Sequence, residues 1–181
     1  MTSNAYRLVH HEISSPGIAG SAHYRVHPLL AATSADTYRS ATVDSTGQLH
    51  IVKNSGEEIL PKKLRAQVAF SDAALSSDGT TAGWLANYSN PDGSDPATDY
   101  IPQGLVIYRA GRVLRTFFTE QIFWDWKFLK LDGGQVAYCT GPTHGSAAEC
   151  SLHEVTTGRH LSRWLPGQNT NPPTWAKDLH Y

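Results

Sequence analysis

The sequence predicts an all-β fold of antiparallel, four-stranded units, and three observations support this prediction. A short apolar strand runs into a glycine turn and a second strand three times, at Gly56, Gly111 and Gly158. These glycines stand 55 and 47 residues apart, a spacing typical of repeats built from one four-stranded unit. Turn residues recur about every 8–12 positions, as in all-β domains. No stretch shows the periodicity of an amphipathic helix.

The composition is that of one folded domain without a charge bias. Of the 181 residues, 40% are hydrophobic and 17% are charged, and the net charge is −1. A chain this close to neutral does not attract nucleic acid or anionic lipid, so we expect neither as a partner. No apolar run approaches the ~20 residues of a membrane-spanning helix. Residues 1–7 are polar and do not resemble a secretory signal.

The first third of the chain is expected to hold a half unit, about residues 40–60. Strands are predicted at 6–13 and 22–26, with a Ser-Ser-Pro-Gly turn after the first and a helical turn at 28–37. A hairpin pairs residues 39–44 with 48–52 around Ser-Thr-Gly.

The second unit is expected to span residues 68–118. Its strands are predicted at 68–75, 80–88, 105–109 and 112–118. The first turn contains Asp78 and Gly79, where glycine takes the positive φ angle that the turn requires. A polar loop rich in Pro and Gly separates the second and third strands.

The third unit, residues 124–164, repeats this pattern. Strands are predicted at 124–129, 135–139, 151–155 and 159–164, with an Asp-Gly-Gly turn after the first. Three residue pairs share an offset of 54 positions: Asp78 and Asp132, Leu75 and Leu129, and Trp84 and Tyr138. Landmarks in one common register indicate a true repeat.

Residues 166–181 are predicted to form an extended arm, because their prolines block both helix and ladder hydrogen bonds. Trp175 and Tyr181 favour an arm that docks on the domain, and a disordered tail is the alternative.

The segment 74–79, Ala-Leu-Ser-Ser-Asp-Gly, resembles the turn of WD40-like repeats of the TolB type, whose usual form is Ser-Pro-Asp-Gly. Ser77 stands in place of the proline, and residues 130–133 keep only the Asp-Gly pair. The resemblance covers about residues 68–164 and implies two full β-propeller blades after a half-blade, within one domain of residues 1–165. Propellers host enzymes, scaffolds and ligand binders, so the resemblance implies no function.

Ring closure is the point at which the chain departs from that family. A closed propeller needs about four blades or more, and 181 residues supply three at most. We therefore expect a propeller-like fragment or a sandwich. Its open edges are either paired in a homo-oligomer or covered by the terminal arms.

The two cysteines, Cys139 and Cys150, flank a loop between two predicted strands. If they form a disulfide, it adds about 2–3 kcal/mol of stability and places the protein in a periplasm or outside the cell. Two free thiols in a cytosolic protein are the alternative. We expect the disulfide.

Patterns for metal, cofactor or covalent chemistry are weak. Nine histidines occur without a His-Glu-x-x-His or Cys-x-x-Cys spacing, so no metal site and no cofactor are predicted. The loop containing Asp92 and Asp99 offers oxygens to calcium but lacks the spacing of a calcium loop, and a solvated turn is the alternative. A hydrolase without a Gly-x-Ser-x-Gly motif would use Asp125 or His144.

The aromatic run 123–126 is the strongest candidate for a binding element. Strict strand alternation places Trp124 and Trp126 on one face, with Phe123 and Asp125 on the other. These tryptophans either pack between blades or are exposed, in which case they stack on a ligand or anchor a partner.

Three functions remain open. The first is a non-catalytic module, such as a periplasmic inhibitor or immunity protein, that binds another protein through the loops 90–102 and 141–149. Tyr100, His144 and Asp92 would contribute to this surface. The second is a lectin-like oligomer that binds glycan in inter-blade clefts lined by tryptophan, and the third is the hydrolase.

Overall fold

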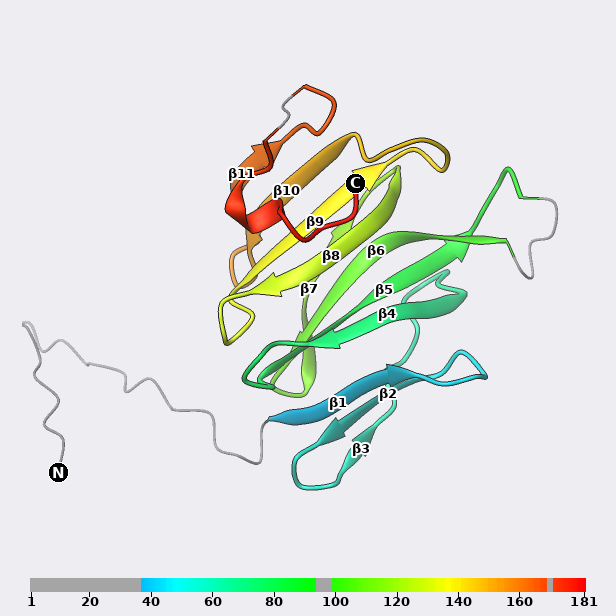
Figure 1. The fold of residues 1–181 in the computed structure, drawn as a ribbon. Coiled ribbons are helices and arrows are strands. Elements are labelled where there is room, and N and C mark those ends of the chain that lie inside the picture. The colour runs from blue at the N-terminus through cyan, green and yellow to red at the C-terminus, as the bar shows by residue number, and fades with distance from the viewer. Residues whose placement is uncertain (1–36, 94–98, 169–170) are drawn as a thin grey trace, which may run out of the picture. The chain divides into compact units, whose positions relative to one another are not determined.

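The computed structural model describes residues 37–93, 99–168 and 171–181, which all belong to the unit Ala31–Tyr181 (Figure 1). The predicted strands 6–13 and 22–26, and the helical turn 28–37 apart from Thr37, lie outside the described residues. The all-β prediction is confirmed, because the described residues form three antiparallel sheets and one short 3-10 helix. None of their helices is long and apolar enough to cross a membrane.

Each sheet is built from strands that follow one another in the chain. The first sheet has three strands: β1 (Tyr38–Val43), β2 (Leu49–Lys53) and β3 (Glu58–Ile59). The second sheet has four: β4 (Ala69–Leu75), β5 (Thr81–Ser89), β6 (Tyr100–Arg109) and β7 (Arg112–Phe118). The third sheet also has four: β8 (Ile122–Leu129), β9 (Gln135–Gly141), β10 (Glu149–Glu154) and β11 (His160–Trp164).

The loop between β5 and β6 is shorter than expected. Strand β6 begins at Tyr100, opposite Ser89, so residues 100–102 belong to the sheet and not to a loop 90–102. Pro102 is accommodated beside a register shift between Ala86 and Asn87. The extra residue at this bulge is Gln103, while Pro102 lies opposite Asn87 next to the interruption in the ladder, where a proline without an N–H is tolerated.

The two Asp-Gly turns occupy equivalent places and also contact each other. Asp78 accepts the backbone N–H of Thr80, and Asp132 accepts that of Gly134, each two residues further on. The backbone N–H of Asp78 then donates to the carbonyl oxygen of Leu131 at 3.0 Å. The repeated turns therefore shape their own hairpins and also join the second sheet to the third.

The apolar side chains form three cores. The first core lies between the first and second sheets, with Leu49 and Ile51 packed beside Trp84. The second lies between the second and third sheets and includes Leu105 and Trp126. The third lies on the outer face of the third sheet. The sheets therefore pack face to face in chain order.

The predicted alternation of the run 123–126 is wrong. A register shift between Phe123 and Asp125 makes Trp124 an extra residue in β8. Because a bulge reverses the alternation beyond it, Phe123 and Trp126 both enter the core between the second and third sheets. Trp124 packs instead against the core on the outer face of the third sheet.

The predicted disulfide between Cys139 and Cys150 is present. The two residues face each other on β9 and β10, and both are fully buried on the outer face of the third sheet. The C-terminal segment, with its 3-10 helix η2 (Thr174–Ala176), lies against this face (Figure 1). Ala176 and Leu179 of this segment belong to the same core.

Candidate functional site

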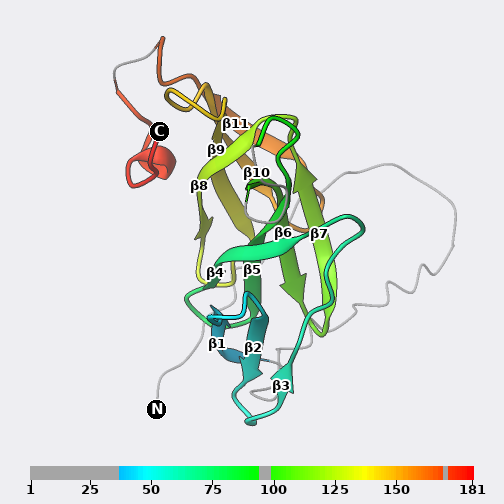
Figure 2. The same ribbon diagram turned by 90° about the vertical axis from the view of Figure 1, so that its right-hand side faces the viewer.

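The two ends of the sheets carry different connections. At the end that we call the turn end, short turns with positive-φ glycines join the strands, as at Gly79, Gly111 and Gly158. At the opposite end, the loop end, five connections meet, whose described residues are 44–48, 60–68, 90–93 with 99, 119–121 and 142–148. These connections lie to the right in Figure 1, and Figure 2 views the sheets from that side.

Three hollows lie at the loop end. One of about 420 Å³ lies between the 44–47 turn and the start of β4, and Tyr100 and Lys63 line it. Another of about 460 Å³ lies between the 142–148 loop and residues 165–168. The third, of about 440 Å³, lies between the 119–121 connection and the third sheet. A partner that approaches this end therefore meets a surface with recesses.

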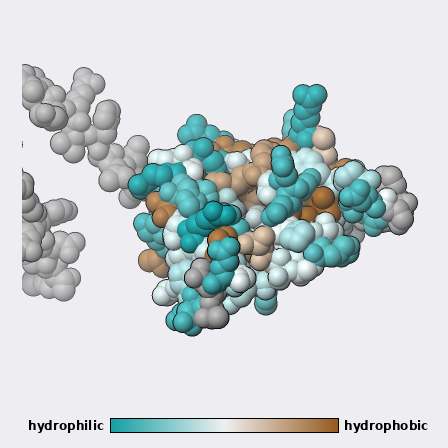
Figure 3. Space-filling view, turned by 90° about the horizontal axis from the view of Figure 1, so that it is seen from above, coloured by the Kyte–Doolittle hydropathy of each residue, from teal (hydrophilic) through white to brown (hydrophobic). Residues whose placement is uncertain are grey.

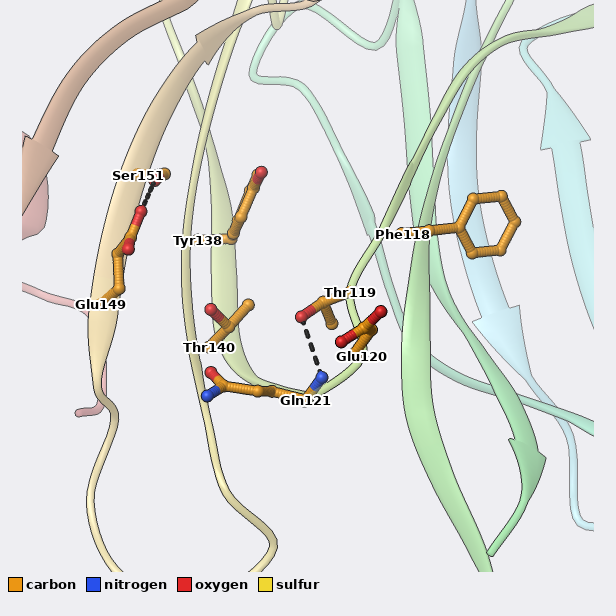
Figure 4. A pocket seen from close by; sticks show the side chains of 8 residues that line it. All are labelled: Phe118, Thr119, Glu120, Gln121, Tyr138, Thr140, Glu149 and Ser151. Atoms are coloured by element: carbon orange, nitrogen blue, oxygen red, sulfur yellow. Dashed lines mark hydrogen bonds between the residues drawn. The ribbon is translucent and has the colours of Figure 1, made fainter.

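The hollow beside the 119–121 connection is lined almost entirely by acceptor-bearing side chains (Figure 4). Glu149 is fixed there, because one of its oxygens accepts the Ser151 hydroxyl at 3.0 Å and the other pairs with Arg163 at 2.6 Å. The Thr119 hydroxyl accepts the backbone N–H of Gln121 at 3.1 Å. These bonds hold the walls of the hollow in place before any ligand arrives.

Tyr138 and His153 form a hydrogen-bonded pair at the inner wall. His153 Nδ1 donates to the carbonyl oxygen of Gly158 at 3.2 Å, which leaves Nε2 to accept the Tyr138 hydroxyl at 3.0 Å. Burial, and then the charge of Glu149, raise the pKa of Tyr138 to about 12. Burial lowers the pKa of His153. Near neutral pH the pair is therefore an uncharged phenol and an uncharged imidazole, suited to hydrogen bonding.

Large apolar side chains are exposed at the loop end. Phe118, the last residue of β7, is 65% exposed, and its ring lies 6.2 Å from that of Tyr88. Figure 4 shows the Phe118 ring pointing away from the other residues around the hollow. Tyr100 is 46% exposed beside the neighbouring hollow. Leu131 at the turn end is exposed to a similar degree, at 73%.

The predicted partner-binding residues separate into two groups. Tyr100, His144 and Asp92 are exposed at the loop end, in or beside two different loops. Trp126 is 7% exposed, and its indole N–H donates to the carbonyl oxygen of Asp72. Trp124 is half-buried, and its indole nitrogen is shielded from solvent. Trp126 is thus part of the core, whereas Trp124 keeps part of its surface exposed, and the tryptophan-lined cleft stays a prediction.

Asp125 and His144, the residues that a hydrolase would use, lie in different environments. Asp125 accepts the backbone N–H of Trp126 at 2.7 Å and that of His180 at 2.9 Å. Both of its oxygens are thus used to hold the backbone, one of them that of the C-terminal arm. His144 lies exposed in the 142–148 loop. No group of three metal-ligating side chains occurs within the described ranges.

Sequence reasoning missed Phe118 and the 119–121 connection. The sequence feature that could have indicated an exposed ring is the Phe117-Phe118 pair at the end of a strand, because adjacent residues of a strand point to opposite faces of the sheet. Phe117 enters the core between the second and third sheets, and Phe118 faces the other way. A pair of adjacent aromatic residues at the end of an outer strand therefore marks an exposed ring.

Comparisons with known proteins give only distant structural matches. No model of a protein family matches the sequence, and no curated protein matches it. Solved structures that match include a functionally unknown protein from Desulfotomaculum acetoxidans DSM 771, with 13% identity, 69% of this chain and 36% of that chain covered, and a TM-score of 0.43. The C-terminal WD40 domain of Sif2 matches with 14% identity, 72% and 38% coverage, and a TM-score of 0.40. The chain thus matches less than two fifths of the length of these structures, at a level that carries no functional conclusion.

Proposed function

We propose that this chain is a protein-binding module that contacts its partner through the loop end. The observation that carries the proposal is the exposure of Phe118, 65%, at the border of a preformed hollow. A partner that covers this ring removes apolar surface from water, which favours binding. Aromatic side chains next to recesses are also the residues that dominate binding energy at protein interfaces.

Tyr100 extends this surface toward the first sheet. It borders the hollow beside the 44–47 turn, and the next residue, Ile101, pairs with Tyr88, whose ring contacts that of Phe118. The two exposed rings would therefore act as neighbouring anchors, while His144 and Asp92 lie on the flanking loops. Charged and polar rim residues are expected to tune specificity more than affinity.

We also propose that the protein works in an oxidising compartment, such as a periplasm or the extracellular space. Disulfides persist there and are rare in the cytosol, and the bond between Cys139 and Cys150 is fully buried in a core. A secreted or envelope inhibitor, or an immunity protein, fits these properties.

The test starts from a partner captured by cross-linking to the wild-type chain and then purified. We expect Phe118→Ala to weaken its affinity by about tenfold or more, the usual effect of removing an interface anchor. Tyr100→Ala should have a smaller effect in the same direction. Leu131→Ala is the matched control, because Leu131 is equally apolar and exposed but lies at the turn end.

Binding that is unaffected by Phe118→Ala and Tyr100→Ala, with or without a loss in Leu131→Ala, would rule out the loop end as the interface. All three variants alter exposed side chains, so unchanged circular dichroism spectra would show that the fold is intact in each.

A further inference from the structure

The outer face of the third sheet has the character of a sheet-packing surface. By the 54-residue offset, Ala137 and Cys139 correspond to Gly83 and Leu85 of the second sheet. Gly83 lies directly under the Trp126 indole, since a Cβ placed there would come within 2.6 Å of the ring. The face on which the third sheet packs is thus repeated, in small and apolar residues, on the third sheet itself.

The C-terminal arm covers that face where a fourth sheet would otherwise pack. Ala176 and Leu179 are buried against it, and the Tyr181 ring meets Trp164 edge to face at 4.6 Å. The polar contacts of the arm are exposed: Asp178 pairs with Lys127 at 3.1 Å, and His180 donates its backbone N–H to Asp125. Exposed contacts of this kind contribute little stability, so a few apolar contacts hold the arm.

The core under the arm contains two indole nitrogens, those of Trp124 and Trp164, that are buried without a hydrogen-bond partner among the described residues. The indole nitrogen of Trp84, in the core between the first and second sheets, is buried in the same way. The face under the arm therefore shares this property with a face on which a sheet packs. Seen from above, the surface shows apolar side chains interspersed with polar ones (Figure 3).

The first sheet does not offer a complementary surface at the other end of the stack. Its side chains that face away from the second sheet include His50, which pairs with Asp44 at 2.9 Å and with Glu58 at 2.7 Å. Thr42 on the same side is exposed. Such a polar face would lose hydration if the third sheet of another copy packed on it. If the third sheets of two copies pack on each other instead, no polar face loses its hydration.

We propose that the outer face of the third sheet is a docking surface for a second copy of this chain, in a two-fold symmetric pair, and that the C-terminal arm is its built-in cover. In a two-fold pair the same patch on each copy meets its counterpart. The face resembles the interface between the second and third sheets, so its preferred occupant is another sheet. Release of the arm makes the face available, and its return separates the pair. This surface is distinct from the loop end, and the inference does not rest on the proposed function.

The test uses the full chain with the arm loosened by one substitution. Leu179→Asp places a charge in the core under the arm, so the arm should leave the face, and light scattering should show a doubling of the 19.8 kDa mass. Thr174→Asp, at an exposed position of the arm, adds the same charge and should stay at the mass of the wild type, which we expect to be a monomer. A synthetic peptide of residues 171–181 should return the Leu179→Asp chain to the monomer mass.

Tyr181→Ala is a milder variant that removes the ring contact with Trp164 without burying a charge, and it should give a smaller dimer fraction. Chains with native near-ultraviolet circular dichroism that remain monomeric in both variants would overturn the proposal. Assembly that grows beyond a dimer, or that the peptide does not reverse, would also overturn it, because it would indicate unspecific association of an apolar surface.

Discussion

The second and third sheets have the same plan but different covers. Both consist of four consecutive strands and have an Asp-Gly turn after the first strand. Equivalent residues of the two sheets are 54 positions apart in the sequence. The second sheet is packed on both faces by other sheets, whereas the third has a sheet on one face and the C-terminal arm on the other. The repeated residues therefore determine each sheet, while non-repeated residues determine where the stack of sheets ends.

The non-repeated residues of the third sheet stabilise it where the stack ends. At the position of Leu85 in the second sheet, the third sheet has Cys139, which is cross-linked to Cys150. The second sheet gains stability from burial against two neighbours, and the third gains part of it from a covalent bond. The arm then removes the remaining apolar surface from water.

The largest expected effect concerns the interface between the two sheets. Trp126→Ala should lower the free energy of unfolding by about 3–5 kcal/mol, the usual cost of removing a buried tryptophan. Trp126 packs over Gly83 and meets Phe128 edge to face at 5.2 Å. Trp124→Ala should cost less, because Trp124 is only half-buried. Guanidinium denaturation measures both values, and equal losses would contradict the different environments that the bulge creates.

The disulfide, which lies in the third sheet, should contribute the next largest effect. Replacing Cys139 and Cys150 together by alanine should lower the free energy of unfolding by about 2–3 kcal/mol, mainly because the unfolded chain becomes less constrained. Denaturation with and without a reductant checks this. The reductant should destabilise the wild type and leave the double variant unchanged. A wild-type chain that is insensitive to reductant when unfolded would show that the bond does not stabilise the fold.

A smaller effect is expected where the two Asp-Gly turns meet. The Thr81 hydroxyl donates to the carbonyl oxygen of Asp132 at 2.8 Å and accepts from Arg109 Nε at 2.7 Å. Thr81→Val should cost about 1–2 kcal/mol, since it removes two hydrogen bonds, one of them to the charged guanidinium of Arg109. Arg109→Ala measured alone and together with Thr81→Val forms a double-mutant cycle. Strictly additive losses would show that the two side chains do not act as one link.

The elements that could be predicted from sequence are those set by local chemistry. Glycine and Asx turns such as those at Asp78 and Asp132 give the hairpins and, through their repetition, the sheets. The loop-end position of Tyr100 and His144 follows from the same strand order. The pairing of Cys139 with Cys150 also follows, because the two residues bracket a single connection.

The elements that could not be predicted depend on contacts between sheets. Alternation along β8 gives the wrong face for Trp124, because the bulge that displaces it has no residue signature of its own. Which of Phe117 and Phe118 is exposed depends on how far a neighbouring sheet extends, and β3 is only two residues long. Proline content predicts an extended arm but not the face that Leu179 covers.

The smallest effect that we expect is a difference in pKa between a histidine of the first sheet, His50, and one of the third, His153. Hydrogen bonds from His50 to Glu58 and then to Asp44 raise the pKa of His50, whereas burial lowers the pKa of His153. The stability that His50 adds is therefore complete below the unfolded value of about 6.5 and is lost as the pH rises through its folded pKa. The contribution of His153 is present above that value and is lost as the pH falls through its folded pKa.

Ring-proton NMR spectra recorded across this pH range measure the two midpoints, with His50→Gln and His153→Gln used to assign the signals. We expect the His50 midpoint above the value found in the urea-unfolded chain and the His153 midpoint below it. The two shifts have different physical origins, because His50 gains two carboxylate partners on a half-exposed surface while His153 is enclosed by the rings of Phe117 and Tyr138. If both histidines titrated at the unfolded midpoint, neither environment would form in solution as described. If His153 alone did so, the core between the second and third sheets would admit water at its outer edge.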